Sequence, residues 1–270
     1  MTTITNHSLY RYPGGKNRMK KDLQKIIMEV KPDLNFMVSP FLGGGSLELL
    51  MAGSNGNLWE DRIKVQAYDI FKPLADFWEI LKEEGGVRIA AEVRKHMPLT
   101  HNDEYKAFLP NLDSDDKFTR AWSFYICIKA SYSGMIGSTT ERARSELREA
   151  GLEKLERFEN PYFSMEWGDC FETIQKHNKD FMYLDPPYYK TVNHYYGKKG
   201  ELHKAFNHEK YCEILKEHKG GFVMSYDNSD KVKELYKDWT EFRYLTFPYQ
   251  MSGKKRYNKE ELVIIKYPTL

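Results

Sequence analysis

Short apolar runs alternate with amphipathic segments along most of this chain, and this alternation limits its fold more than any other feature. The apolar runs have the length of strands, and the segments after them repeat apolar residues at helical spacing. Such alternation is typical of a doubly wound, mostly parallel α/β sheet. We predict strands at residues 35–41, 64–69, 162–167, 181–185, 221–226, 242–247 and 261–267, and helices at 17–30, 71–82, 171–177, 208–217 and 230–239.

The last two predicted strands are separated only by residues 248–259. A parallel connection needs a crossover, usually a helix, and this loop is too short to contain one. The two strands should therefore pair as an antiparallel hairpin at the edge of the sheet. The prediction is a seven-stranded sheet that is parallel except for this hairpin.

Residues 94–160 have a different texture, because their pattern is mostly helical and strongly charged. A polar stretch rich in glycine and serine interrupts it at 131–140, and such a stretch is typical of an exposed loop or hairpin. We therefore predict an α/β domain formed by residues 1–93 and 161–270. Residues 94–160 are predicted to form a mainly helical domain inserted into it.

The composition restricts the setting in which the chain works. Of its 270 residues 41% are hydrophobic, and 41 Lys+Arg against 39 Asp+Glu give a formal charge of +2. Binding to a polyanion would therefore need locally basic loops rather than bulk basicity. The sequence contains no apolar run of membrane-spanning length, no signal peptide, and no cysteine pair with metal or disulfide spacing. We expect a cytoplasmic protein without a membrane anchor or a metal.

The segment FMYLDPPYY at residues 181–189 carries the most informative motif. An apolar strand ends at Asp185, and Pro186 and Pro187 follow without N–H donors, so their carbonyls stay available as acceptors. One carboxylate, one carbonyl and the ring of Tyr188 suit a planar, uncharged ring that bears an exocyclic amine. Holding both amine hydrogens favours a pyramidal nitrogen whose lone pair can attack. The motif therefore predicts chemistry at an aromatic amine.

This tetrapeptide matches the DPPY motif of amino-directed DNA methyltransferases, and the chain resembles the Dam-like N6-adenine class of bacteria and phages. The other motifs follow in the order of that class: YPGGK at 12–16, PFLGGGS at 40–46, the acid Asp69, DCF at 169–171, and a basic hairpin that runs into Glu261. The resemblance implies a Rossmann-like methyltransferase fold. It also implies methyl transfer from S-adenosylmethionine to the N6 amine of a flipped-out adenine in double-stranded DNA.

The resemblance also implies roles for individual residues. Tyr12 and Lys16 would close over S-adenosylmethionine, Asp69 would hold its ribose hydroxyls, and Asp169 would accept from its adenine amine. The glycines after the first strand would let the backbone approach the ligand, although a glycine run also suits a dinucleotide phosphate. The implied catalytic residues are Asp185, Pro186, Pro187 and Tyr188, and the implied cofactor-binding residues are Tyr12, Lys16, Phe41, Gly43, Gly45, Asp69, Asp169 and Asp185.

DNA contacts are expected from the helical segment and from two basic loops. The stretch ASYSGMIGS at 130–138 has the aromatic-Ser-Gly pattern of the family's recognition hairpin, but the Arg-x-Asn stretch of members that methylate GATC is absent. We therefore do not expect GATC specificity. Basic clusters are also common on solvated loops. Arginines and glutamates interleave at residues 141–149, and this pattern is also typical of a solvent-exposed helix face with salt bridges. The candidate DNA-binding residues are Tyr132, Ser133, Arg142, Lys198, Lys199, Lys254 and Lys255.

Several alternatives remain open. A dehydrogenase would explain the glycine run and Asp69 but neither DPPY nor PGGK. Methyltransferases acting on RNA or on a protein glutamine typically have Asn where this chain has Asp185. Cytosine-N4 methylation would use the same acceptors, and a catalytically inactive DNA-binding relative would bind DNA without methyl transfer. We expect a monomer, and a cognate restriction enzyme is a candidate partner.

Overall fold

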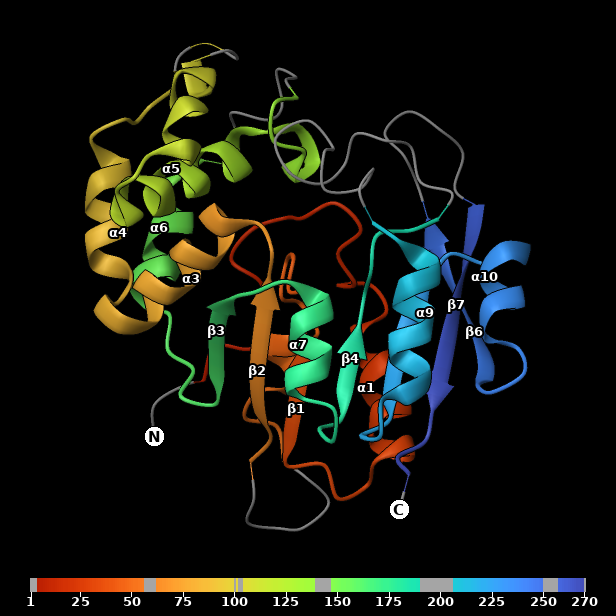
Figure 1. Ribbon diagram of the computed structural model, residues 1–270. Coiled ribbons are helices and arrows are strands. Elements are labelled where there is room, and N and C mark those ends of the chain that lie inside the picture. Colours follow the sequence, from red (N-terminus) through yellow and green to blue (C-terminus); the bar gives the residue numbers. More distant parts are fainter. Residues whose placement is uncertain are drawn as a thin grey trace.

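A single mixed sheet forms the centre of the computed structural model, which describes residues 4–55, 62–99, 101, 104–138, 147–189, 206–249 and 257–269. Its strands are β1 (Phe36–Ser39), β2 (Lys64–Asp69), β3 (Phe163–Trp167), β4 (Met182–Leu184), β5 (Phe222–Tyr226), β6 (Glu241–Tyr249) and β7 (Tyr257–Lys266). In the described residues these strands make one seven-stranded sheet with the order β3-β2-β1-β4-β5-β7-β6 (Figure 1).

The pairing of the strands confirms the predicted topology. β3, β2, β1, β4 and β5 are parallel neighbours. β7 pairs antiparallel with β5 on one side and with β6 on the other, so the hairpin completes the sheet and β6 is its edge. This register sets Glu261 opposite Leu245 and Leu262 opposite Tyr226.

Helices cover both faces of the sheet, with α7 and α9 in front and α1 behind in Figure 1. Helix α1 begins later than residue 17, because the preceding residues form turns in which Gly15 N–H donates to Tyr12 O and Met19 N–H to Lys16 O. No described helix has the length and apolar character needed to cross a membrane. The helices are α1 (Lys20–Val30), α2 (Glu48–Met51), α3 (Lys72–Glu84), α4 (Gly86–Arg94), α5 (Lys117–Ala130), α6 (Glu149–Glu156), α7 (Cys170–Lys176), α9 (His208–Glu217) and α10 (Asp230–Tyr236), with 3-10 turns η1 (Glu104–Phe108), η2 (Pro110–Asp113) and η3 (Tyr132–Gly134).

The helical segment lies beyond the carboxyl ends of β2 and β3, where α4, α5 and α6 gather (Figure 1). Its core is continuous with that of the sheet through α3, because the ring of Phe77 stacks on Tyr125 of α5 at 5.6 Å. Helix α4 precedes the predicted boundary at residue 94 and also packs on α5 and α6. The division into a domain of residues 1–93 and 161–270 and an insertion of 94–160 stays a prediction.

A buried chain of hydrogen bonds links this core to the glycine run that follows β1. Trp78 is fully buried in α3, and its indole N–H donates to the hydroxyl of Tyr10 at 2.8 Å. That hydroxyl donates in turn to the carbonyl of Gly43 at 3.1 Å. The rings of Phe77 and Phe124 contact Tyr10 edge-on and fix its orientation. The position of the glycine run therefore depends on the aromatic core.

The substitution Tyr10→Phe keeps the ring but leaves the indole N–H of Trp78 buried without its acceptor. We expect the free energy of unfolding to fall by roughly 1–3 kcal/mol, the usual cost of a buried donor without a partner. Urea denaturation measures the change. Tyr244→Phe, at a side chain that is 46% exposed, is the control and should leave stability unchanged. Equal midpoints for Tyr10→Phe and the wild type would contradict the expectation.

Candidate active site

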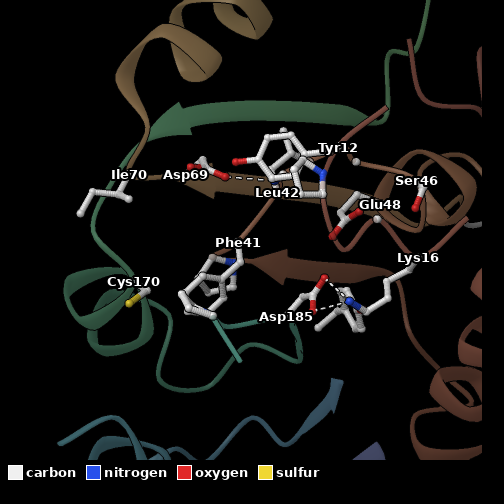
Figure 2. Close-up of a pocket in the computed structure, with 18 of the residues that line it drawn as sticks. Tyr12, Lys16, Phe41, Leu42, Ser46, Glu48, Asp69, Ile70, Cys170 and Asp185 are labelled. Carbon is white, nitrogen blue, oxygen red and sulfur yellow. Dashed lines mark hydrogen bonds and ion pairs between the residues drawn. The ribbon is translucent and has the colours of Figure 1, made fainter. Parts of the chain in front are cut away.

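Four parallel strands bring the predicted site residues to one edge of the sheet. Phe41 follows β1, Asp69 ends β2, Asp169 follows β3 and Asp185 follows β4. These strands are neighbours in the sheet, so their carboxyl ends lie side by side, where open α/β sheets bind their ligands. All four residues line one cavity of about 250 Å³ (Figure 2).

The cavity brings together every residue that was predicted to bind the cofactor. Pro187 of the tetrapeptide lines it as well, whereas Pro186 and Tyr188 are not among its described lining residues. Figure 2 shows Asp69, Ile70 and Cys170 toward one end and Lys16, Glu48 and Asp185 toward the other. The cofactor candidates in its wall are Tyr12, Lys16, Phe41, Gly43, Gly45, Asp69, Asp169 and Asp185.

The glycine run is shaped by its contact with Tyr12. Gly43 and Gly45 have φ angles of +50° and +61°, which side-chain-bearing residues rarely adopt. A Cβ on Gly43 would lie 3.0 Å from the ring of Tyr12, and one on Gly44 would lie 2.9 Å from its Cβ. The glycines are therefore needed for the packing of the two loops that line the cavity. The expectation that these glycines also let a ligand come close to the backbone stays a prediction.

The carboxylate of Asp69 holds the glycine run in place. Its Oδ2 accepts from the N–H of Gly43 at 3.0 Å, and its Oδ1 accepts from the N–H of Phe71 at 2.9 Å. Burial raises the pKa of Asp69 to about 6, although these two hydrogen bonds oppose the rise. Each carboxylate oxygen can accept more than one hydrogen bond, so ribose hydroxyls would share these oxygens with the backbone.

Asp169 caps the amino end of α7. Its Oδ1 accepts from the N–H of Phe171 at 2.8 Å and, less closely, from Glu172 at 3.4 Å. Phe171 lines the cavity together with Ile70, which is 44% exposed. These two apolar side chains and the capping acid provide a partly apolar end that suits a heterocyclic ring. The assignment of Asp169 to the cofactor's adenine amine stays a prediction.

Lys16 lies against the acid of the tetrapeptide. Its Nζ is 2.6 and 2.7 Å from the two carboxylate oxygens of Asp185, and it also donates to the carbonyl of Gly14 at 2.9 Å (Figure 2). The side chain of Lys16 is 6% exposed and that of Asp185 is 22% exposed. The resemblance places Lys16 over the cofactor, and the structure adds a direct ion pair with the proposed catalytic acid.

The ring of Tyr188 is held on two sides. One face stacks on Tyr226, with ring centroids 6.0 Å apart and an interplanar angle of 28°. The hydroxyl donates to the carboxylate of Glu261, and Lys16 Nζ lies 5.0 Å from the ring centroid. Tyr188 is 8% exposed, so the ring that was predicted to stack on a base is covered in this conformation.

Two buried acids at the site were not assigned a role from the sequence. Glu48 lines the cavity and accepts from the hydroxyl of Ser39 at 2.9 Å, and Glu261 lies beside Lys16 and Tyr188. Burial raises the pKa of each to about 7. Both stand in apolar runs, SLELLM and ELVIIK. For Glu48 the signal is a single acid inside an apolar run, whereas Glu261 directly follows Glu260 and the sequence around it gives no such signal.

The lining of the cavity favours a cationic ligand. Four acids and one lysine are among its described lining residues, and the acids are Glu48, Asp69, Asp169 and Asp185. S-adenosylmethionine carries a sulfonium and an ammonium, and its adenine suits the apolar end at Ile70 and Phe171. The residues present therefore fit this group, with carboxylates for its positive charges and apolar faces for its ring.

The candidate DNA contacts are only partly described. Tyr132 is half-buried and Ser133 is exposed with a φ of 53° in a 3-10 turn rather than in two paired strands. A backbone hydrogen bond from Tyr132 N–H to Ser138 O closes this turn at 3.4 Å. A Cβ on Gly134 would lie 2.3 Å from the carbonyl of Arg11, so the turn packs tightly on the residue before Tyr12. Arg142, Lys198, Lys199, Lys254 and Lys255 lie outside the described residues.

Replacing Glu48 with Gln should change how stability depends on pH. The folded state holds the pKa of Glu48 at about 7, above its ordinary 4.5, so ionisation lowers the free energy of unfolding as pH rises from 4.5 to 7. Gln keeps an acceptor for Ser39 but cannot ionise. We expect Glu48→Gln to be more stable than the wild type at pH 8 by roughly 1–3 kcal/mol, and nearly equal at pH 5.

Denaturation at both pH values measures this difference. Glu213→Gln, at an exposed position on α9, is the control and should follow the wild type at both. A wild-type dependence on pH in Glu48→Gln would show that this carboxyl does not resist ionisation in the folded protein.

Comparison with solved structures finds methyltransferases at low similarity. The precorrin-6y C5,15-methyltransferase from Geobacter metallireducens GS-15 is 10% identical, with 95% of this chain and 92% of that chain covered and a TM-score of 0.37. A putative RNA methyltransferase from Pyrococcus horikoshii is also 10% identical, with 97% and 85% covered and a TM-score of 0.38. At such scores these likenesses carry no conclusion about function. No curated protein matches the sequence.

The family comparison covers most of the chain. Residues 12–252 match the family described as D12 class N6 adenine-specific DNA methyltransferase. The match begins at Tyr12, runs through the glycine run and the DPPY tetrapeptide, and ends at residue 252, before β7. It agrees with the motif order and with the cavity built from these motifs. The chain thus belongs to the D12 class of N6 adenine-specific DNA methyltransferases, with DNA as its substrate and S-adenosylmethionine as its methyl donor.

Proposed function

We propose that Asp185 is the catalytic acceptor for the N6 amine of an adenine that is rotated out of double-stranded DNA. One amine hydrogen would go to its carboxylate and the other to a carbonyl of Pro186 or Pro187, as the family motif implies. The observation that carries this proposal is the position of Asp185 at the end of β4, facing the cavity beside the glycine run. Its side chain is the more exposed member of the pair with Lys16.

The proposal that the adenine leaves the duplex stack rests on the position of Asp185 in the wall of a cavity. An adenine in a duplex stack cannot reach a carboxylate in the wall of a cavity unless it leaves the stack, which costs a few kcal/mol. Stacking on Tyr188 would offset part of that cost. The covered state of this ring in the structure means that the base would have to displace what lies over it.

The residues that would hold the donor are those of the cavity wall. Asp69 and Asp169 would bind the ribose and the adenine, and Tyr12 would close over them. When bound, S-adenosylmethionine would supply a methyl group activated by its sulfonium; the amine nitrogen would gain the methyl group and lose one hydrogen as a proton, and S-adenosylhomocysteine would be released. The chain therefore has to supply mainly proximity and alignment. The carboxylate of Asp185 also stabilises the positive charge that develops on the amine nitrogen.

We propose that the segment 94–160 recognises the DNA sequence, through Tyr132, Ser133 and Arg142. The turn at 131–138 supports this assignment, because Ser133 is exposed and Gly134 packs on the loop that leads into the cavity. Lys198, Lys199, Lys254 and Lys255 would contact phosphates, which fix position without reading sequence.

We further propose that the protein acts as a monomer in the cytoplasm. Its described cysteines, Cys127, Cys170 and Cys212, are buried and form no disulfide with one another, which is typical of a reducing compartment. Light scattering of the purified protein tests the monomer. We also propose a cognate restriction enzyme as a partner. DNA methylated by this protein should then resist cleavage by that enzyme.

Asp185→Ala tests the proposed catalytic role. We expect methyl transfer to fall by roughly 10²–10³-fold or more, because the acceptor that orients the amine is lost. Transfer of a labelled methyl group from S-adenosylmethionine to unmethylated genomic DNA measures this loss. Asp33→Ala, with a side chain 63% exposed, is the control and should keep wild-type turnover. Near-normal turnover in Asp185→Ala, with donor and DNA still bound, would remove the proposed role.

The base and its sequence context can be determined in one experiment. Genomic DNA treated with the wild type and sequenced by long reads should carry N6-methyladenine at a single recurrent context other than GATC. N4-methylcytosine would favour the alternative reaction on cytosine. DNA binding without any modified base would favour a catalytically inactive relative.

A further inference from the structure

Two acids from different segments approach the same lysine next to the tetrapeptide. We propose that Glu261 is a positioning residue for methyl transfer, which anchors Tyr188 and takes over Lys16 when Asp185 binds the target amine. This inference rests on the proposed function of Asp185. It adds a residue of β7 to the acids Asp69, Asp169 and Asp185 at the carboxyl ends of β2, β3 and β4.

The geometry around Lys16 is that of one cation between two carboxylates. Its Nζ lies 2.6 Å from the nearer oxygen of Asp185 and 3.6 Å from Oε1 of Glu261. A hydrogen bond between an ammonium and a carboxylate needs roughly 2.7–2.9 Å, so a shift of about 1 Å would exchange one partner for the other. Lysine is a flexible point charge, which makes so small a shift easy.

Such an exchange would clear the carboxylate of Asp185 for the target amine. Both of its oxygens are within 2.7 Å of Lys16 Nζ, so the ammonium occupies the acceptor that the amine needs. The same ammonium lies over the ring of Tyr188, and Tyr226 stacks on that ring as well. A base that stacks on Tyr188 and donates to Asp185 would therefore compete with Lys16 at both contacts.

Glu261 is placed to form an ion pair with the ammonium of Lys16. Its carboxyl is buried in the central part of β7, which is fixed by pairing with β5 and β6 on either side. A buried ammonium without a partner is strongly unfavourable, so Lys16 can leave Asp185 only toward another anion. Among the described residues, Lys16, Asp185 and Tyr188 are titratable groups that face Glu261.

The charge of Glu261 depends on what surrounds it. Burial and the nearby Asp185 raise its pKa to about 7, while Lys16 lowers it. Above that pH the carboxylate attracts Lys16, and below it the neutral acid does not. The exchange of partners should thus become easier as pH rises through about 7, and methyl transfer should rise with it.

Glu261 also fixes the ring that would meet the base. Tyr188 donates its hydroxyl to Glu261, so the ring orientation depends on a side chain from a distant strand. A loss of this contact would let the ring rotate, and a misplacement of about 1 Å can cost roughly 100-fold in rate. The tyrosine and the glutamate should therefore act as one unit.

The test compares Glu261→Gln, Tyr188→Phe and the double variant with the wild type in single-turnover methyl transfer to unmethylated genomic DNA. We expect each single change to slow transfer by roughly 10-fold to 100-fold, and the double to be no slower than the worse single. The dissociation constant of S-adenosylmethionine, measured by calorimetry, should stay within about three-fold. The rise of the rate through pH 7 should be lost in Glu261→Gln.

Glu260→Gln is the matched control, because Glu260 precedes Glu261 in β7 but has an exposed side chain. It should keep the wild-type rate and pH profile. If Glu261→Gln does not fold, the test uses Tyr188→Phe, which deletes a single oxygen. Its rate of methyl transfer and its affinity for S-adenosylmethionine are then compared with those of the wild type. A wild-type rate and pH rise in Glu261→Gln, or independent effects in the double variant, would overturn the inference. A wild type that transfers no methyl group to DNA would instead refute the proposed function.

Discussion

Parallel pairing of β1 with β2 on one side and β4 on the other is the constraint on which the site depends. It brings the glycine run, Asp69 and Asp185 to one edge although they are far apart in the sequence. Pairing of β2 with β3 adds Asp169. Every interaction described for the cavity, from the hold of Asp69 on Gly43 to the pair of Lys16 and Asp185, presupposes this register.

Local patterns predicted the strands and the edge hairpin, because each depends on periodicity or loop length, and the resemblance to the family supplied the residues that line the cavity. The partners of Lys16 and Tyr188 could not be predicted in this way. Asp185 lies 169 residues from Lys16, and Glu261 lies 73 residues from Tyr188. No local pattern reports which side chains meet across such distances. For the same reason the prediction of an exposed loop or hairpin at 131–140 could not include the packing of Gly134 on the carbonyl of Arg11.

The electrostatics of the site follow from this arrangement. One buried ammonium lies among carboxyl groups, and burial makes Glu48, Asp69 and Glu261 harder to ionise than they are in water. A site of this kind tolerates the positive charge of a sulfonium better than an apolar cavity would. It also keeps Asp185 paired when no other donor is bound, which avoids an isolated charge.

The contact of Gly134 with Arg11 joins the turn proposed to read DNA to the loop whose Tyr12 packs on the glycine run. A displacement of the turn would shift the loop, and the reverse, because the backbone of Gly134 contacts the backbone of Arg11 with no flexible side chain between them. Free-energy coupling between two ligands is reciprocal. In the function proposed above, DNA bound at the turn and donor bound beside Tyr12 would act on two backbone segments in direct contact, so that binding of one would alter the affinity for the other.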